Sequence, residues 1–326
     1  QPENSLVAHA LAQGHNVFLV SWRNIGTPQQ HLTWEDYVEQ GVIAALGVAR
    51  DIAGSEKVNA LGFCAGGTLL SCALAVLAAR GQEFVASVTL LTTLLDFSDA
   101  GELGLLVNET SLAAREAAIG QGGVLKGREL AQVFASLRAN DLIWPYVVNG
   151  YLKGKPPPAF DLLFWNGDDS NLPGPMYCWY LRNAYLENKL RVPGATTQCG
   201  QRVDFGRITM PAFIYASRED HIVPWRGAFT STALLGGDCT FTGCVPSKAL
   251  LAAAAAVCGW HYARVAWLYG TPFAANWDPA LGFVWWQDPG YRVAADYWGG
   301  LLAAIADPSW AAFTSVPGGL YASFFG

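Results

Sequence analysis

The sequence predicts an α/β fold, with a doubly wound, mostly parallel sheet and a cap subdomain inserted between its strands. Short apolar segments rich in β-forming residues alternate with segments of helical length, an order typical of parallel sheets joined by crossover helices. One strand-to-helix junction carries a cysteine between glycines, which permits a sharp turn. From 99 to 202 the alternation stops, and we interpret this stretch as the cap.

Each expected element has a local signal. Residues 17–22 (VFLVSW) are a β-forming run between turn residues, and Thr33 with the acidic residues after it is typical of a helix start. The predicted elements are helix 4–13, strand 17–22, helix 33–52, strand 57–63, helix 66–80, strand 84–95 and strand 208–216, followed by a loop over 236–245 and an alanine-rich run over 250–257.

The composition favours one large domain. Of the 326 residues, 52% are hydrophobic and only 14% are charged, so the chain can bury a sizeable core. We therefore expect a single domain over 1–326, with its core in 1–98 and 203–326 and the cap in about 99–202. The many Trp and Phe residues predict some exposed apolar surface, which would suit a partner subunit or a lipid-like substrate.

Charge and hydropathy exclude several function classes. A net charge of −6 argues against nucleic acid as a partner, because phosphate binding requires a basic surface. We find neither a signal peptide nor an apolar stretch long enough for a transmembrane helix. Seven scattered cysteines favour a reducing cytoplasm over a disulfide scaffold. Because the chain starts without Met, directly in a helix, we expect a fragment of a longer protein.

The glycine-flanked cysteine is the strongest chemical signal. Cys64 lies in the pattern G-x-C-x-G (Gly62 to Gly66), after a predicted strand and before a small-residue helix. This arrangement is typical of the nucleophile elbow of α/β-hydrolase-type folds, in which the glycines remove clashing side chains. The backbone N–H of Ala65 would point to a developing oxyanion, and the helix N-terminus is expected to lower the thiol pKa. The alternative is a buried core thiol beside an ordinary turn.

The partners of this nucleophile should follow it in the order acid, then histidine. Asp220 lies in a polar loop at the carboxyl end of strand 208–216, where such sheets place their chemistry, so it is the preferred acid. Asp96 and then Glu219 are the competing acids, and any of the three could instead be a solvated loop carboxylate. Of the five histidines only His221 and His261 follow Cys64, and His261 is the only one after the acid loop.

Many ordered motifs resemble the polymerising synthases of polyhydroxyalkanoates, in particular the type acting on short-chain monomers. The elbow GFCAGGTLL (62–70) resembles that family's lipase box with Cys in place of Ser. The other matches, which extend over roughly 1–235, are NVFLVSWRN (16–24), LTWEDYV (32–38), LLDFSDAGELG (94–104), NDLIWPYVVNGYLKGK (140–155), FDLLFWNGDDSNLPGPMYCWYLRNAYLENKL (160–190) and YASREDHIVPW (215–225).

This resemblance implies an acyltransferase that polymerises (R)-3-hydroxyacyl-CoA and releases CoA, with Cys64 carrying the acyl thioester. It implies that Asp220 activates the hydroxyl of the incoming monomer and that His261, in GWHYARV, forms the thiolate. The expected binding residues lie in the motif 215–225: His221, Arg218 and Trp225. It also implies a homodimer in the cytoplasm at the granule surface, acting on a growing polyester, without a resident cofactor or metal.

Three departures from the family pattern keep other interpretations open. The family's N-terminal domain does not precede Gln1, an additional stretch over 236–256 precedes His261, and the tail after 266 has little family character. Residues 236–248 resemble the redox segment of flavin disulfide reductases, but no dinucleotide-binding glycine pattern precedes Cys239 and Cys244. The alternatives are a thiol esterase or depolymerase of the same fold, or a truncated or chimeric derivative without activity.

Overall fold

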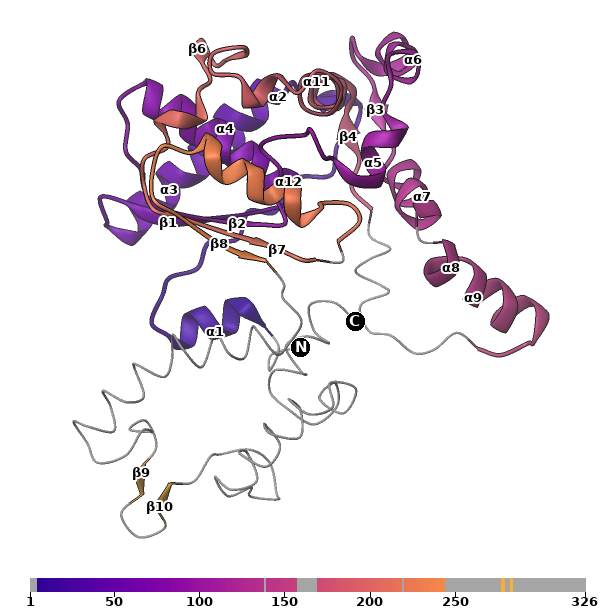
Figure 1. Ribbon diagram of the computed structural model, residues 1–326, viewed down its shortest axis with the longest axis horizontal. Helices are drawn as coiled ribbons and strands as arrows, with labels where there is room; N and C mark the ends of the chain where they lie inside the picture. Colours follow the sequence, from indigo (N-terminus) through magenta and orange to yellow (C-terminus); the bar gives the residue numbers. More distant parts are fainter. Residues whose placement is uncertain are drawn as a thin grey trace. The chain divides into compact units, whose positions relative to one another are not determined.

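A computed structural model describes residues 5–137, 139–156, 169–218 and 220–243, and two short strands at 277–278 and 282–283 (Figure 1). The described residues fall into two units, each considered by itself. One is Phe18–Gly243, and the other includes the N-terminal helix and the two short strands. None of the described helices is long and apolar enough to cross a bilayer.

A four-stranded parallel sheet organises residues 18–243. Its strands are β1 (Val58–Phe63), β2 (Val85–Leu91), β7 (Ala212–Ala216) and β8 (Cys239–Gly243), in the order β1-β2-β7-β8. Leu90 of β2 pairs with Gly62 of β1 on one side and with Ile214 of β7 on the other. This register aligns the carboxyl ends of the strands at one edge, and it confirms the predicted parallel α/β architecture.

Helices cover one face of this sheet (Figure 1). They are α2 (Trp34–Asp36), η3 (Tyr37–Ile43), α3 (Ala44–Ala53), α4 (Ala65–Ala79), α12 (Trp225–Thr230) and η8 (Ser231–Leu234), with η2 (Thr27–Gln29) before them and η7 (Phe205–Arg207) before β7. The α4 helix is apolar on all sides and is almost entirely buried from Gly67 to Leu77, as expected for the central helix of a core. The opposite face exposes Leu61, Phe63 and Phe213.

The expected cap region is largely helical. Its elements are α5 (Gly101–Leu106), α6 (Glu109–Ile119), β3 (Val124–Leu125), α7 (Gly127–Leu137), α8 (Ala139–Leu142), α9 (Trp144–Tyr146), η4 (Val147–Leu152), β4 (Leu172–Pro173), α11 (Gly174–Tyr180), η5 (Leu181–Leu186), η6 (Lys189–Arg191), β5 (Thr197–Gln198) and β6 (Gln201–Arg202). Arg182 holds part of it together, because it forms ion pairs with Glu109, Glu116 and Glu187. The ion pairs of Arg182 therefore connect η5 to α6 within the cap region.

The predicted strand over 17–22 is not a strand in the structure. A strand exists only through pairing, and within the described residues this segment pairs with no strand, while Phe18, Leu19 and Val20 stay exposed. The Trp22 ring stacks on Tyr37 of η3 with centroids 5.0 Å apart, and it lies against Gly41, where an added Cβ would come within 2.7 Å of the ring. The segment is thus held by packing of Trp22 on η3, and the expected backbone pairing with another strand is not formed.

The prediction of a loop over 236–245 is wrong for its central part. Residues 239–243 form β8, because alternating Thr and Phe residues suit a strand and the edge of β7 is available to them. The strands over 84–95 and 208–216 exist but are shorter than predicted. Thr92 adopts a φ of +42°, which ends β2 early, and Pro211 precedes the first residue of β7.

The second unit contributes only local structure to the described residues. Helix α1 (Leu6–Ala12) confirms the predicted N-terminal helix, and the Ser5 hydroxyl caps it by accepting a 3.1 Å hydrogen bond from the backbone N–H of Ala8. Strands β9 (Trp277–Asp278) and β10 (Gly282–Phe283) pair in antiparallel fashion. The predicted alanine-rich run lies outside the described residues.

Close packing between β1 and α4 depends on two glycines. A Cβ on Gly62 would lie 2.5 Å from the Cα of Gly67, and a Cβ on Gly67 would lie 2.1 Å from the Oγ1 of Thr93. By contrast, a Cβ on Gly66 would meet nothing within 4 Å. The expectation that Gly62 and Gly66 both remove clashes is thus correct for Gly62 and wrong for Gly66, whose role belongs to Gly67.

This difference yields a stability prediction. Gly67→Ala should lower the free energy of unfolding by about 1–3 kcal/mol, the usual cost of inserting atoms into a close-packed core. Gly66→Ala, the matched control one residue away, should be neutral or stabilising by up to about 1 kcal/mol, because Ala is the better helix former. Urea unfolding followed by circular dichroism measures both, and equal losses in the two variants would contradict the proposed contact.

Candidate active site

Cys64 occupies a strained turn between β1 and α4. Its φ of 51° and ψ of −128° place a residue with a side chain in a region that normally only glycine occupies. Three backbone hydrogen bonds hold it: Cys64 donates to Leu91 at 2.9 Å, while its carbonyl accepts from the N–H groups of Gly67 at 2.9 Å and Thr68 at 3.3 Å. The Thr93 hydroxyl donates a further bond of 3.2 Å to the same carbonyl. The predicted elbow is confirmed as a structure.

The thiol of Cys64 is partly buried, and its pKa is raised. Burial is the largest cause, and the negative charge of Asp220 raises the pKa further, whereas a hydrogen bond from the backbone N–H of Ala65 lowers it. The expectation that the helix N-terminus lowers the thiol pKa is therefore wrong as a net effect, because desolvation outweighs that bond. Asp220 is thus near enough to act on the charge of Cys64, and Ala65 follows Cys64 as the first residue of α4; the catalytic roles of these residues stay predictions.

Asp220 is fixed by its own loop. Its Oδ1 accepts hydrogen bonds of 2.9 Å from the backbone N–H groups of Ile222 and Val223. These bonds orient the carboxylate at the carboxyl end of β7, the edge where the Cys64 turn also lies. In the described residues, Oδ2 accepts no hydrogen bond. One oxygen of Asp220 therefore positions the side chain.

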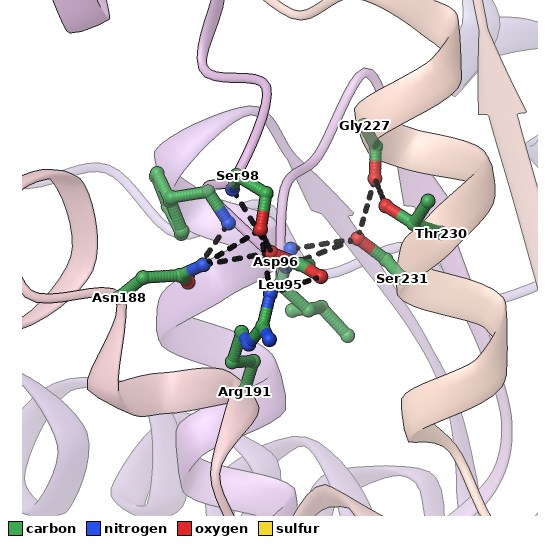
Figure 2. Close-up of polar contacts among 9 residues, drawn as sticks. Leu95, Asp96, Ser98, Asn188, Arg191, Gly227, Thr230 and Ser231 are labelled. Carbon is green, nitrogen blue, oxygen red and sulfur yellow. Dashed lines mark hydrogen bonds and ion pairs between the residues drawn. The ribbon is translucent and has the colours of Figure 1, made fainter.

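Asp96, the competing acid, is engaged in a structural network (Figure 2). Its Oδ1 accepts from the backbone N–H and hydroxyl of Ser98 and from the amide of Asn188 at 2.8 Å, and Oδ2 lies 3.5 Å from Arg191. Burial alone would raise the pKa of Asp96, but these hydrogen bonds and the charge of Arg191 lower it overall. Asp96 is therefore ionised and connects the loop after β2 to Asn188 and Arg191, rather than acting as a partner of Cys64.

The same network reaches α12. The Ser231 hydroxyl accepts from the backbone N–H groups of Leu95 at 2.9 Å and Asp96 at 3.3 Å, and it donates to the carbonyl of Gly227 (Figure 2). Ser231 is fully buried. The loop after β2 is thus joined to α12 on one side and to the segment around Asn188 on the other.

The predicted binding residues His221, Arg218 and Trp225 lie in the loop around Asp220 and at the start of α12. The Nε2 of His221 is buried and has no hydrogen-bond partner within the described part of the chain. Arg218 is exposed in the turn before Asp220, while Trp225 begins α12, packs on the core and carries the Arg226 guanidinium 5.6 Å from its ring. His261, Glu219 and Cys244 lie outside the described residues, and the Cys239 thiol in β8 has a pKa raised by burial.

Aromatic side chains of the cap pack against Trp34 of α2. The ring of Trp34 stacks on Trp179 at 4.9 Å and on Tyr180 at 5.1 Å, and its Nε1 donates to the buried Gln198. Tyr185 extends this cluster, because its ring packs edge on against Tyr180 and Phe97. Among the described residues, no group of His, Cys, Asp and Glu side chains is arranged to hold a metal ion.

Comparison with known proteins places the chain in a family. The family described as alpha/beta hydrolase fold matches residues 1–240. The chain belongs to the alpha/beta hydrolase fold family. Among solved structures, the monoacylglycerol lipase of Paleococcus ferrophilus is 13% identical with a TM-score of 0.38 and covers 66% of each chain, a similarity too low to support any conclusion.

Sequence relatives confirm the resemblance to polyhydroxyalkanoate synthases. The poly(3-hydroxyalkanoate) polymerase subunit PhaC of Cupriavidus necator is 58% identical over 246 residues, which is 74% of this chain and 42% of that protein. The subunit of the same name from Rhizobium meliloti is 42% identical over 240 residues, 74% of this chain and 39% of that protein. The chain therefore spans about two fifths of the length of these polymerases.

The electrostatic link between Asp220 and Cys64 can be tested by alkylation. Asp220→Asn removes the charge that raises the thiol pKa but keeps an oxygen that can accept the backbone bonds of Ile222 and Val223. The thiolate fraction at neutral pH should rise, so iodoacetamide should label Cys64 severalfold faster, with the pH profile shifted to lower pH. Asp51→Asn, an exposed charge paired with Arg50, is the control and should leave the profile unchanged. An unshifted profile in Asp220→Asn would show that the two groups are not coupled.

Proposed function

We propose that this chain is the acyl-transferring part of a polyhydroxyalkanoate polymerase, which joins (R)-3-hydroxyacyl groups from CoA into a polyester. The observation that carries the proposal is the strained Cys64 turn with Asp220 beside it, in a chain 58% identical to a named polymerase subunit. A thiol at a strand-to-helix elbow is suited to forming an acyl thioester.

In the first step the Cys64 thiolate attacks the thioester carbonyl of the acyl-CoA. A new carbon–sulfur bond forms, the carbonyl oxygen becomes an oxyanion, and the bond to the CoA sulfur then breaks. The proton of the thiol is transferred by a base to the departing CoA thiolate. The backbone N–H of Ala65 stabilises the oxyanion, since it already donates to the Cys64 sulfur and belongs to the first residue of α4. His261 is the base implied by the resemblance.

In the second step a bound 3-hydroxyl attacks the acyl group on Cys64. Asp220 accepts the hydroxyl proton through Oδ2 while Oδ1 stays bonded to the loop. The C–O bond of the ester forms as the carbon–sulfur bond to Cys64 breaks, and Asp220 passes the proton on to the departing Cys64 sulfur, which restores the thiol and the carboxylate. The extended chain is then carried by the CoA thioester of the attacking monomer and returns to Cys64 by the first step. A thioester is well suited to this exchange because its acyl carbon is activated toward a hydroxyl nucleophile.

Several properties of this activity follow from the same proposal. His221, Arg218 and Trp225 belong to the loop and helix that follow β7, so they are proposed to contact the substrate near Asp220. No resident cofactor or metal is needed, because CoA enters and leaves as part of the substrate. The proposal includes a homodimer that works in the cytoplasm at the surface of the polyester granule.

The direct test is release of free CoA from (R)-3-hydroxybutyryl-CoA, followed with a thiol reagent, together with analysis of the product. The chain should release CoA and form insoluble polyester, Cys64→Ala should release none, and Asp220→Asn should release one equivalent per site and then stall. Soluble 3-hydroxybutyrate as the only product would instead assign the chain to thioester hydrolysis. No Cys64-dependent release from a folded chain would contradict both activities.

A further inference from the structure

The peptide group between His221 and Ile222 connects the cap to Asp220 through two hydrogen bonds. Its carbonyl accepts a bond of 3.0 Å from the backbone N–H of Glu102, and its N–H donates a bond of 2.9 Å to the Oδ1 of Asp220. Glu102 is the second residue of α5, the first helix of the cap region. Hydrogen bonds that share one peptide group polarise it and strengthen each other. The start of the cap and the carboxylate of Asp220 are therefore joined by one continuous hydrogen-bonded path.

Gly101 allows α5 to approach the loop that carries Asp220. Its φ is +59°, in the region that favours glycine, and an added Cβ would lie 2.3 Å from the carbonyl oxygen of His221 and 3.0 Å from that of Ile222. No side chain fits in this contact. The side chain of Glu102 is exposed and has no hydrogen bond or ion pair within the described residues. The hydrogen bond from α5 to the loop thus comes from the backbone and depends on the glycine before it.

The segment before α5 is held to α12, which follows the same loop. A Cβ on Gly227 of α12 would lie 2.5 Å from the carbonyl oxygen of Asp99, so the two backbones are in direct contact. The hydroxyl of Ser231, the residue after α12, accepts from the backbone N–H groups of Leu95 and Asp96 (Figure 2). This segment therefore cannot simply move away if α5 is pushed off the loop.

We propose that Gly101 and the backbone N–H of Glu102 are positioning groups for Asp220 in the transfer of the acyl group to the next hydroxyl. Neither touches the substrate, and both act through the peptide group that bonds to the carboxylate. A general base must lie within hydrogen-bond reach of the proton that it accepts, so a displaced carboxylate loses much of its effect. The inference rests on the proposed function, in which Asp220 accepts the proton of the attacking hydroxyl and passes it to the departing sulfur.

Such a role affects one step of the reaction only. In the proposed function Asp220 serves the transfer step, whereas acylation of Cys64 depends on the thiol, its base and the backbone N–H of Ala65. A displaced Asp220 should therefore leave acylation fast and slow the transfer, so that acylated Cys64 accumulates. A loss of structural support for the whole site would slow both steps. The ratio of the two rates thus separates a positioning role from a general structural one.

The variants change the contact at Gly101 and match its backbone elsewhere. Gly101→Ala adds a methyl group against the carbonyl of His221, and Gly101→Asn adds a Cβ with less backbone strain, because asparagine adopts a positive φ more readily. Gly54→Ala is the matched control, since Gly54 follows α3 with a φ of +62° and an added Cβ would meet nothing within 4 Å. Glu102→Ala removes the exposed side chain and keeps the backbone N–H.

The measurement is rapid-quench release of CoA from (R)-3-hydroxybutyryl-CoA, with acylation of the protein followed by intact-protein mass spectrometry. Gly54→Ala and Glu102→Ala should show the same first turnover and the same steady state as the wild type. Both Gly101 variants should release the first equivalent at the wild-type rate and then turn over roughly 10- to 10²-fold more slowly, the usual effect of misplacing a catalytic group by up to about 1 Å. The acylated protein should accumulate in both.

Three results would overturn the inference. An unchanged steady state in the Gly101 variants would show that the contact does not govern Asp220. A parallel loss of the first turnover and the steady state would show that Gly101 supports the site as a whole. An equal slowing in Gly54→Ala would show that backbone strain alone accounts for the effect. If Gly101→Ala does not fold, Gly101→Asn decides among these outcomes.

The same experiment distinguishes failure of this inference from failure of the proposed function. If the wild type forms polymer and the Gly101 variants form it equally fast, the inference fails alone. If the wild type is acylated but releases only soluble 3-hydroxybutyrate, the polymerase proposal fails, and the hydrolytic steady state of the Gly101 variants decides whether they position Asp220. If (R)-3-hydroxybutyryl-CoA does not acylate the wild type, both fail.

Discussion

The strained backbone at Cys64 is the constraint on which the rest of the site depends. A residue with a side chain at a φ of 51° and a ψ of −128° costs on the order of 1–3 kcal/mol, so the surrounding structure must impose it. The hydrogen bond to Leu91 of β2, the start of α4, and the contact of Gly62 with Gly67 together do so. The strain presents the thiol at the carboxyl edge of the sheet, where parallel α/β folds place their ligands.

The polar groups around this turn divide into two sets with different tasks. Asp96, Asn188, Arg191 and Ser231 satisfy one another and join the loop after β2 to the cap and to α12, so they contribute rigidity. Asp220 instead uses a single carboxylate oxygen, Oδ1, for its own loop within the described residues. A buried group that is fully bonded stabilises the fold, whereas spare capacity beside a nucleophile can be used by a substrate.

Much of this arrangement could be predicted from the sequence. The elbow around Cys64, the parallel strands and the position of Asp220 follow from short-range patterns, because glycine spacing and strand-to-helix order constrain the local backbone strongly. The strand over 17–22 and the loop over 236–245 were predicted wrongly because strand formation depends on residues distant in the sequence. Residues 239–243 pair with β7, whereas 17–22 pair with no strand although β1 is an edge strand, and Trp22 packs on η3.

Prediction of the chemistry of the site depends even more on contacts between residues that are distant in the sequence. The pattern around Cys64 suggested a thiol activated by a helix N-terminus, but burial and the charge of Asp220 determine the sign of its pKa shift. Asp96 and Asp220 were comparable as strand-end carboxylates, and only the contacts of Asn188 and Arg191 showed that Asp96 is engaged elsewhere.

The measurement that tests the central claim most directly is the site of acylation among the seven cysteines of the chain. The folded chain is mixed briefly with (R)-3-hydroxybutyryl-CoA, quenched in acid and digested, and the acylated peptide is identified by mass spectrometry. If the strained turn is what makes a thiol reactive here, the acyl group should be found on Cys64, and unfolding the chain before the reaction should abolish that selectivity. An acyl group on Cys199 or Cys239 in the folded chain, or equal labelling before and after unfolding, would contradict the account.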